Sequence, residues 1–454
     1  VVQSRTVAEI RDSGLYVGGT LGVNADSDVD VEHVTAAAGG GFQSAVSGSA
    51  SMILIGNGTS GEAGDELGDI LDLAADMVAG EKVSEVDNAD SRYADDSSRQ
   101  DVTGQSLAAL DAERRQRLGD EQGSLSDGEL QDVNDRGRYD LASHFGNGAD
   151  ADVTRAAIIG GTIEAGTVEV RAEDRTTTFN LAGAANLAGG GLAAGGGVAA
   201  TRVYNDVQAE LQAASLQAAG SVTVTARAVD GSGDAAHALA FAGTVGVVGL
   251  GAAWADAYLE NAVSATLAGK VDATGVVTVE AKDDSSADAQ DLVAAAGAAA
   301  GGVVVANAAK RSGINAALAG SAQVFALDGV QVIADSDGAV YAKAQGAAGG
   351  LSAAGNAAVA VARDDARVRA ALEANASLYG GDSILVQATA RPQTGAEALG
   401  VAVAGGGAVG ASVADAYAGT QVAARIEGGV TAEAKDITVL GRSLQPSSGH
   451  TAAA

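Results

Sequence analysis

A short pattern returns along this chain at nearly constant spacing: a hydrophobic residue, any residue, Val, any residue, then Ala or Gly. Counted on the central Val, the steps from residue 170 to residue 439 are 54, 55, 53, 54 and 53 residues long. The central residues are Val23, Val170, Val224, Val279, Val332, Val386 and Val439. A fixed period of this kind indicates a repeat architecture, in which each unit packs against its neighbours.

Each repeat has the pattern of β-structure. Val and Thr alternate with period two in segments such as 222–226, and glycine clusters follow at a regular phase. Strands separated by glycine turns, without a helical pattern between them, predict an all-β fold: a parallel β-helix, or β-solenoid, of about 54-residue repeats. We expect two coils of about 27 residues in each repeat, hence roughly 13 coils and a rod on the order of 60 Å long at a strand spacing of ~4.8 Å.

The composition predicts a narrow interior. The chain has 64 Gly and 2 Pro among 454 residues, and only 3% of its residues are aromatic. A core of large aromatic side chains is therefore excluded, whereas close packing of Ala and Val in a regular backbone is compatible with these numbers.

One long step interrupts the period. The distance from Val23 to Val170 equals one repeat plus an insertion of about 93 residues. We therefore expect a first solenoid repeat over 1–60, an acidic insertion of helices and loops over 61–150, and solenoid repeats over 151–442. The Ser-rich segment 443–454 has the composition of a tail or linker.

Acidic residues follow the patterned strand in most repeats. Because equal phase in a solenoid means stacking in space, they predict an acidic ridge, and a bound calcium ion would relieve the repulsion between its carboxylates. The candidate metal ligands are Asp26, Asp28, Asp30, Asp283, Asp284, Asp335 and Asp337. The alternative is a solvated acidic surface without metal. No cofactor is required, and calcium is the candidate ion.

Several function classes are excluded or disfavoured. A net charge of −31 is incompatible with a nucleic-acid footprint. The chain has no Cys, and its four His lie far apart in sequence, so a His-based metal site or triad is not expected. The motif at 405–410 resembles a dinucleotide fingerprint but predicts a glycine turn, and the uncharged segments 235–255 and 292–309 predict buried strands rather than membrane spans.

No cluster of carboxylates, a base and aromatic residues stands out, so we do not expect an enzyme. A β-helix that binds or degrades polysaccharide nevertheless stays open as an alternative. Its aromatic platform would be formed by Tyr204, Trp254, Tyr258 and Tyr417, which lie at similar phases of the repeat. The simpler interpretation of these residues is edge packing.

The repeat resembles that of giant secreted bacterial exoproteins of the filamentous haemagglutinin and leukotoxin-like adhesin type. The resembling units are Gly-Ala-Ser-Val-Ala-Asp-Ala-Tyr at 410–417, then Val422-Ala-Ala424, Val430-Thr-Ala432 and Asp436-Ile-Thr-Val439. The resemblance covers about 1–58 and 151–442. It implies a right-handed parallel β-helix, export to the cell surface, and a role in adhesion or matrix building.

We therefore expect a non-enzymatic structural β-solenoid of a bacterial cell-surface or extracellular fibre, secreted, with a cell-surface or polysaccharide partner as a candidate. The alternative within the same fold is a subunit that self-associates head to tail into a filament of an extracellular matrix. Unpaired strand edges at the two ends of a solenoid favour such stacking. No nucleic-acid partner and no membrane span are expected.

Overall fold

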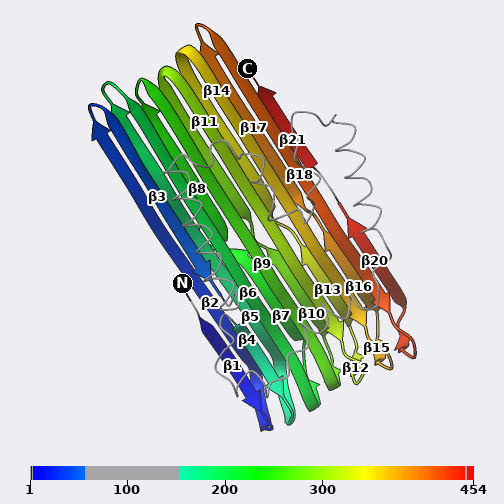
Figure 1. The fold of residues 1–454 in the computed structure, drawn as a ribbon. Coiled ribbons are helices and arrows are strands. Elements are labelled where there is room, and N and C mark those ends of the chain that lie inside the picture. Colours follow the sequence, from blue (N-terminus) through cyan, green and yellow to red (C-terminus); the bar gives the residue numbers. More distant parts are fainter. Residues whose placement is uncertain (1, 3, 57–152, 445–446, 454) are drawn as a thin grey trace.

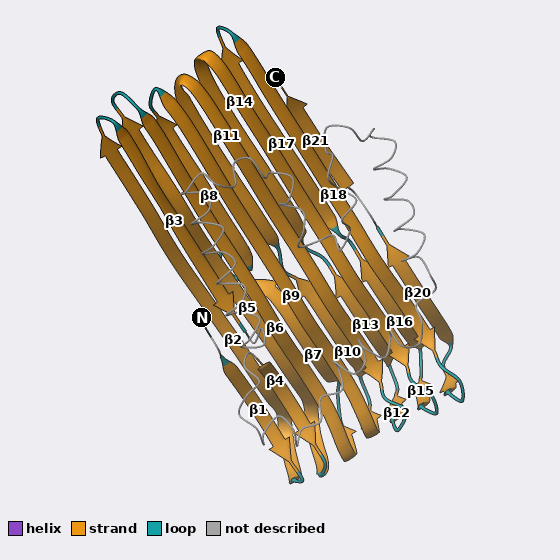
Figure 2. Cartoon of the chain, in the orientation of Figure 1, coloured by secondary structure: helices purple, strands orange, loops and turns teal. Residues whose placement is uncertain are grey.

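The computed structural model describes residues 2, 4–56, 153–444 and 447–453 (Figure 1). These residues form strands and short turns, and none of them is helical (Figure 2). All pairs of named strands are parallel, so among the described residues the predicted all-β parallel β-helix is confirmed. The strands are β1 (Arg5–Arg11), β2 (Gly14–Gly41), β3 (Ser44–Ile55), β4 (Val153–Ile159), β5 (Thr162–Ala188), β6 (Leu192–Ala218), β7 (Val222–Asp230), β8 (Ala236–Val245), β9 (Val248–Ala273), β10 (Val276–Asp284), β11 (Ala287–Leu318), β12 (Gln323–Ala326), β13 (Gly329–Ser336), β14 (Ala339–Leu372), β15 (Ser377–Gly380), β16 (Ser383–Ala390), β17 (Gln393–Ala404), β18 (Gly407–Ile426), β19 (Thr431–Glu433), β20 (Asp436–Ser443) and β21 (Ser447–Ala453).

Each repeat forms one flattened coil, here called a rung. A rung runs up one long side, turns, returns along a second long side, and closes through a short corner strand such as β15. Figure 1 shows the long strands side by side, with the chain progressing from the blue edge to the red edge. The two long sides face each other, because residues of both contribute to the same hydrophobic clusters.

The prediction of two coils in each repeat is wrong. Val170 pairs with Val224, Val224 with Val279, and Val279 with Val332, so one full repeat separates neighbouring rungs. A long side takes up about 20 residues, such as 353–372, which span roughly 65 Å, whereas the stack of seven anchor valines spans only about 30 Å. The molecule is therefore a flat plate that is longer along its strands than along its stacking axis.

The interior consists of stacked ladders of small side chains. Val170, Val224, Val279, Val332 and Val386 are all completely buried, since the period-two alternation turns each of them inward. Leucines such as Leu211, Leu267, Leu318 and Leu372 face them from the return side. Further along the rung, the core consists mainly of Ala. The expectation of a narrow interior packed by small residues is thus confirmed.

The expected turns lie at the rung ends. Gly405 and Gly406 connect β17 to β18, and a Cβ atom on Gly406 would lie 2.2 Å from the carbonyl oxygen of Ser352 in the preceding rung. The glycine-turn interpretation of the motif at 405–410 is therefore confirmed for Gly405 and Gly406, whereas residues 407–410 begin β18. Apart from Ala235 and the turn at 246–247, the uncharged segments 235–255 and 292–309 lie in β8, β9 and β11. The expectation of buried strands holds for only part of their side chains, because inward and outward positions alternate and Leu292 is 53% exposed. In the part of the chain that the structure describes, no helix has the length and apolar character needed to cross a membrane.

The predicted insertion over 61–150 lies outside the described residues. On either side of it, Ile55 pairs with Val203 and Val153 pairs with Asp206, so β4 resumes the return side almost where β3 leaves it. Within the segment 443–454, which we expect to be a tail or linker, Ser447–Ala453 form β21 and pair with β17. Parallel pairing uses backbone groups, so a Ser, Gly and Ala composition does not prevent it.

Candidate functional site

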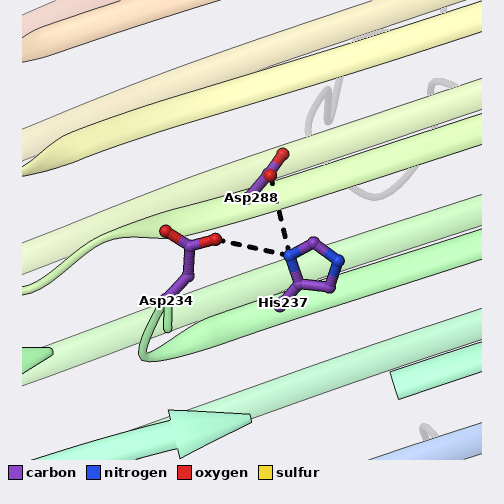
Figure 3. Close-up of side chains that lie close together, drawn as sticks. All are labelled: Asp234, His237 and Asp288. Atoms are coloured by element: carbon purple, nitrogen blue, oxygen red, sulfur yellow. Dashed lines mark hydrogen bonds and ion pairs between the residues drawn. The ribbon is translucent and has the colours of Figure 1, made fainter. Parts of the chain in front are cut away.

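Three side chains that could hold a metal ion meet on one long side of the plate (Figure 3). Asp234 lies in the loop between β7 and β8, His237 near the start of β8, and Asp288 near the start of β11 in the next rung. The Nδ1 atom of His237 is 3.4 Å from Oδ2 of Asp234 and 3.6 Å from Oδ2 of Asp288. Among the described residues, this is the one group of three acidic or histidine side chains whose ligand atoms all lie within 4.8 Å.

Neighbouring rungs hold this group in place. The backbone N–H of His237 donates to Oγ1 of Thr178 at 2.9 Å, and the ring of His237 stacks on Phe179 with centroids 5.4 Å apart. On the same strand as Asp288, Nε2 of Gln290 donates to Oδ2 of Asp288 at 2.7 Å. The imidazole and one carboxylate are therefore oriented by partners that lie outside the group of three.

The group is partly shielded from solvent. The side chains of His237 and Asp288 are 14% and 16% exposed, whereas that of Asp234 is 37% exposed. Burial raises the pKa of Asp288, and the hydrogen bond from Gln290 and the attraction of His237 offset this only in part. The arrangement offers one imidazole nitrogen and two carboxylates, a donor set that first-row transition metals accept.

Sequence reasoning did not anticipate this group, because His237 and Asp288 are distant in the chain. They nevertheless pair directly in register, one rung apart. The repeat period could have indicated that His237 and Asp288 lie side by side. The loop at 231–235 lengthens one rung, however, so the spacing between these two residues is below 54. A search for acidic residues about one repeat from each histidine would have found Asp288.

The predicted acidic ligands do not form one ridge. Asp26, Asp28 and Asp30 lie in an exposed row on one face of β2, as their period-two spacing predicts. Asp283, in contrast, points into the rung and is completely buried. It continues the inward series of Val279 and Ala281, so it is absent from the outer surface.

The other predicted ligands have basic partners. Nζ of Lys282 is 2.6 Å from Asp284, and Nη1 of Arg391 lies 3.0 Å from Asp335 and 3.7 Å from Asp337. The ladder of paired residues that contains Asp335 includes both acidic and basic side chains. It consists of Asp26, Glu173, Arg227, Lys282, Asp335, Thr389 and Arg442. Calcium binding stays a prediction, and it now concerns mainly the row on β2.

A buried ionic cluster lies inside the plate. Nζ of Lys310 donates to the carbonyl oxygens of Ser285 and Asp337 at 2.8 Å each, and lies 3.3 Å from Oδ2 of Asp283. Asp364 follows Lys310 in the same inward ladder and is also buried. Burial lowers the pKa of Lys310, but the attraction of Asp283 and Asp364 outweighs it, so the net shift is upward. The lysine is therefore charged and fully partnered.

Two buried carboxyl groups predict a pH dependence of stability. Burial raises the pKa of Asp364 to about 6, against the attraction of Lys310 and with added repulsion from Asp283 and Asp365. Burial also raises the pKa of Asp291, whose Oδ2 accepts the backbone N–H of Ala255 at 2.7 Å. A raised carboxyl pKa means that the folded chain binds the proton more tightly, so stability falls as pH rises from about 4 through 6.

We expect the free energy of unfolding to be about 1–3 kcal/mol larger at pH 5 than at pH 7.5. Urea unfolding at the two pH values measures this difference. Asp364→Asn removes one of the carboxyl groups whose pKa is raised by burial, so it should reduce this pH dependence of the unfolding free energy. An unfolding free energy that rises from pH 5 to 7.5 would contradict the prediction.

The aromatic residues do not form a continuous platform. The rings of Tyr204 and Tyr258 are 5.7 Å apart, but Ala309 and Arg363 separate Tyr258 from Tyr417 in the same ladder. Arg363 stacks on Tyr417 at 5.0 Å. Trp254 lies apart from them, against Val198 and Ala200. The interpretation as edge packing accounts for these contacts.

No model of a protein family matches the chain, and neither does any curated protein or any solved structure.

Proposed function

We propose that this chain is a non-enzymatic structural β-solenoid, a segment of a fibre or adhesin at the bacterial cell surface or outside the cell. The observation that supports this function is the unbroken parallel ladder from Val23 to Val439. Each rung presents its whole length to the next, so that stability accumulates by nearest-neighbour interfaces. An architecture of this kind suits a spacer or a surface for adhesion.

The surface chemistry agrees with a scaffold. Outward charges along the β10 and β13 sides occur in pairs, such as Lys282 with Asp284 and Arg391 with Asp335. The interior is filled by stacked Val, Leu and Ala side chains. The resemblance of the repeat to secreted adhesins supports the extracellular location.

Antibody labelling of intact cells that produce the protein tests the location. We expect gold particles on the outer surface of unpermeabilised cells and loss of the label after mild protease treatment. Labelling that requires permeabilisation would contradict the proposal. In parallel, the purified chain should release no reducing ends or unsaturated products from a panel of acidic polysaccharides.

Head-to-tail assembly is a second candidate, and the last rung favours it. Ile437 and Val439 occupy inward positions and are each 46% exposed, whereas their partners Ile384 and Val386 are buried. In the register of the stack, a second copy would also place its acidic Asp26 next to Arg442. Charge and apolar surface would thus match at the junction.

Electron micrographs of the purified chain test this assembly. We expect fibres of uniform width, and their loss in the double variant Ile437→Lys/Val439→Lys. Thr438→Lys is the matched control, because Thr438 lies between them on the opposite face of β20. Single plates for the unmodified chain, or fibres that survive the double variant, would contradict head-to-tail stacking.

A further inference from the structure

We propose that Asp234, His237 and Asp288 bind a divalent transition-metal ion, with Zn²⁺ as the preferred ion, and that this ion joins two neighbouring rungs. The proposal is independent of the scaffold function, because it rests only on the contacts of these three side chains.

The spacing of the donor atoms fits a small ion. Ligands of a tetrahedral ion bound at about 2.0–2.2 Å lie about 3.3–3.6 Å from one another. Nδ1 of His237 lies 3.4 Å and 3.6 Å from the two carboxylate oxygens, and all three atoms fall within 4.8 Å of one another (Figure 3). An ion can therefore bind between these three atoms with only small side-chain movements. A fourth position stays open to water or to an external ligand.

The donor types select the ion. Calcium and magnesium prefer oxygen ligands, and calcium takes six to eight of them. One imidazole nitrogen with two carboxylates instead favours zinc and its neighbours in the first transition row. The group thus differs in kind from the exposed carboxylate row on β2.

A second observation points to the same place. Oδ1 of Asp288 is shielded from solvent and accepts no hydrogen bond. A buried carboxylate oxygen without a donor is costly, and a cation bound to this carboxylate compensates it. Oδ2 of Asp288, the oxygen that faces Nδ1 of His237, accepts a hydrogen bond from Nε2 of Gln290 at 2.7 Å, and carboxylates that bind metal ions are commonly hydrogen-bonded in this way.

The backbone around the group is already fixed. The carbonyl oxygen of Asp234 accepts the N–H of Thr178 at 3.1 Å, and the N–H of Ala235 donates to Oδ1 of Asp230 at 3.0 Å. Phe179 limits rotation of the His237 ring. Because Asp234 and His237 belong to one rung and Asp288 to the next, a bound ion adds a cross-link where the long loop interrupts the strand.

Titration calorimetry of the full chain, first treated with chelator and dialysed, tests the proposal with ZnCl₂. We expect one strong site per chain and an upward shift of the melting temperature in zinc, since an ion that binds only the folded chain stabilises it. His237→Ala and Asp288→Asn should each weaken this site by about tenfold or more. Asp284→Asn, which removes the same charge four residues away and beside Lys282, should leave it unchanged.

Cobalt gives a second readout. The intense visible absorption of tetrahedral Co²⁺ should appear with the unmodified chain and with Asp284→Asn, and should be lost in His237→Ala, whose fold is checked by circular dichroism. Zinc affinity that is equal in His237→Ala and in the unmodified chain would place the ion elsewhere on the acidic surface and overturn the proposal. Binding of calcium as tight as that of zinc would overturn it as well.

Discussion

Replacing Lys310 by alanine is expected to lower the free energy of unfolding by about 3–5 kcal/mol. The ammonium group of Lys310 is fully buried and compensates two buried carboxylates, Asp283 and Asp364. Without it, these carboxylates face each other in the interior without a counter-charge. Urea or guanidinium unfolding followed by circular dichroism measures the loss. An unfolding midpoint within error of the unmodified chain would show that the ion pair is not buried as described.

The residues at equivalent positions of neighbouring rungs indicate which further substitutions should restore the stability that Lys310→Ala loses. The ladder through Lys310 has Leu259 before it and Asp364 followed by Ala418 after it. At the position of Asp283, other rungs carry Ala228 and Ala390.

The triple variant Lys310→Leu/Asp283→Ala/Asp364→Ala therefore copies side chains that the plate already accommodates at those positions. We expect it to recover most of the stability that Lys310→Ala loses, because exchanging a complete buried ion cluster for apolar residues is often neutral. A triple variant as unstable as Lys310→Ala would mean that the loss arises from packing of the lysine chain rather than from charge.

The fold was predictable because the repeat combines two periods. Alternation within a strand fixes which face is buried, and the repeat period fixes which residues stack. Val224 and Val279 illustrate both: each is buried, and they pair in register. The number of coils in a repeat was not predictable, because Ala and Gly are acceptable on both faces of a strand. In a segment such as 292–309, the pattern therefore does not separate a continuing strand from a turn.

Alternation along a strand also predicts the positions of two of the candidate calcium ligands. Starting from the inward Val279, every second residue leads to Asp283, so parity already places this carboxylate inside. The same parity from Val23 places Asp26 outside. The contact of His237 with Asp288 depended instead on the loop before β8, whose extra residues change the spacing between rungs. Loop length is set by local turn chemistry that the repeat period does not encode.

The second large effect is expected from Val279→Asp. Val279 is completely buried, and its ladder neighbours Val224 and Val332 are completely buried as well. A carboxylate at this position has no hydrogen-bond donor or counter-charge among the apolar residues of its cluster. We therefore expect the free energy of unfolding to fall by more than about 4 kcal/mol. The matched control is Thr278→Asp, one residue earlier on the outer face of β10, for which the expected change is within about 1 kcal/mol.

The strands in which Val279→Asp reduces stability also test the architecture. In a stack that is stabilised by nearest-neighbour interfaces, one broken rung separates the rungs before it from those after it. Hydrogen exchange of Val279→Asp should therefore show the greatest loss of protection in β10 and in the strands paired with it, β7 and β13, while strands two rungs away keep more of theirs. Uniform loss of protection along the chain would indicate a globally cooperative fold, and equal effects of Val279→Asp and Thr278→Asp would contradict the assigned faces of β10.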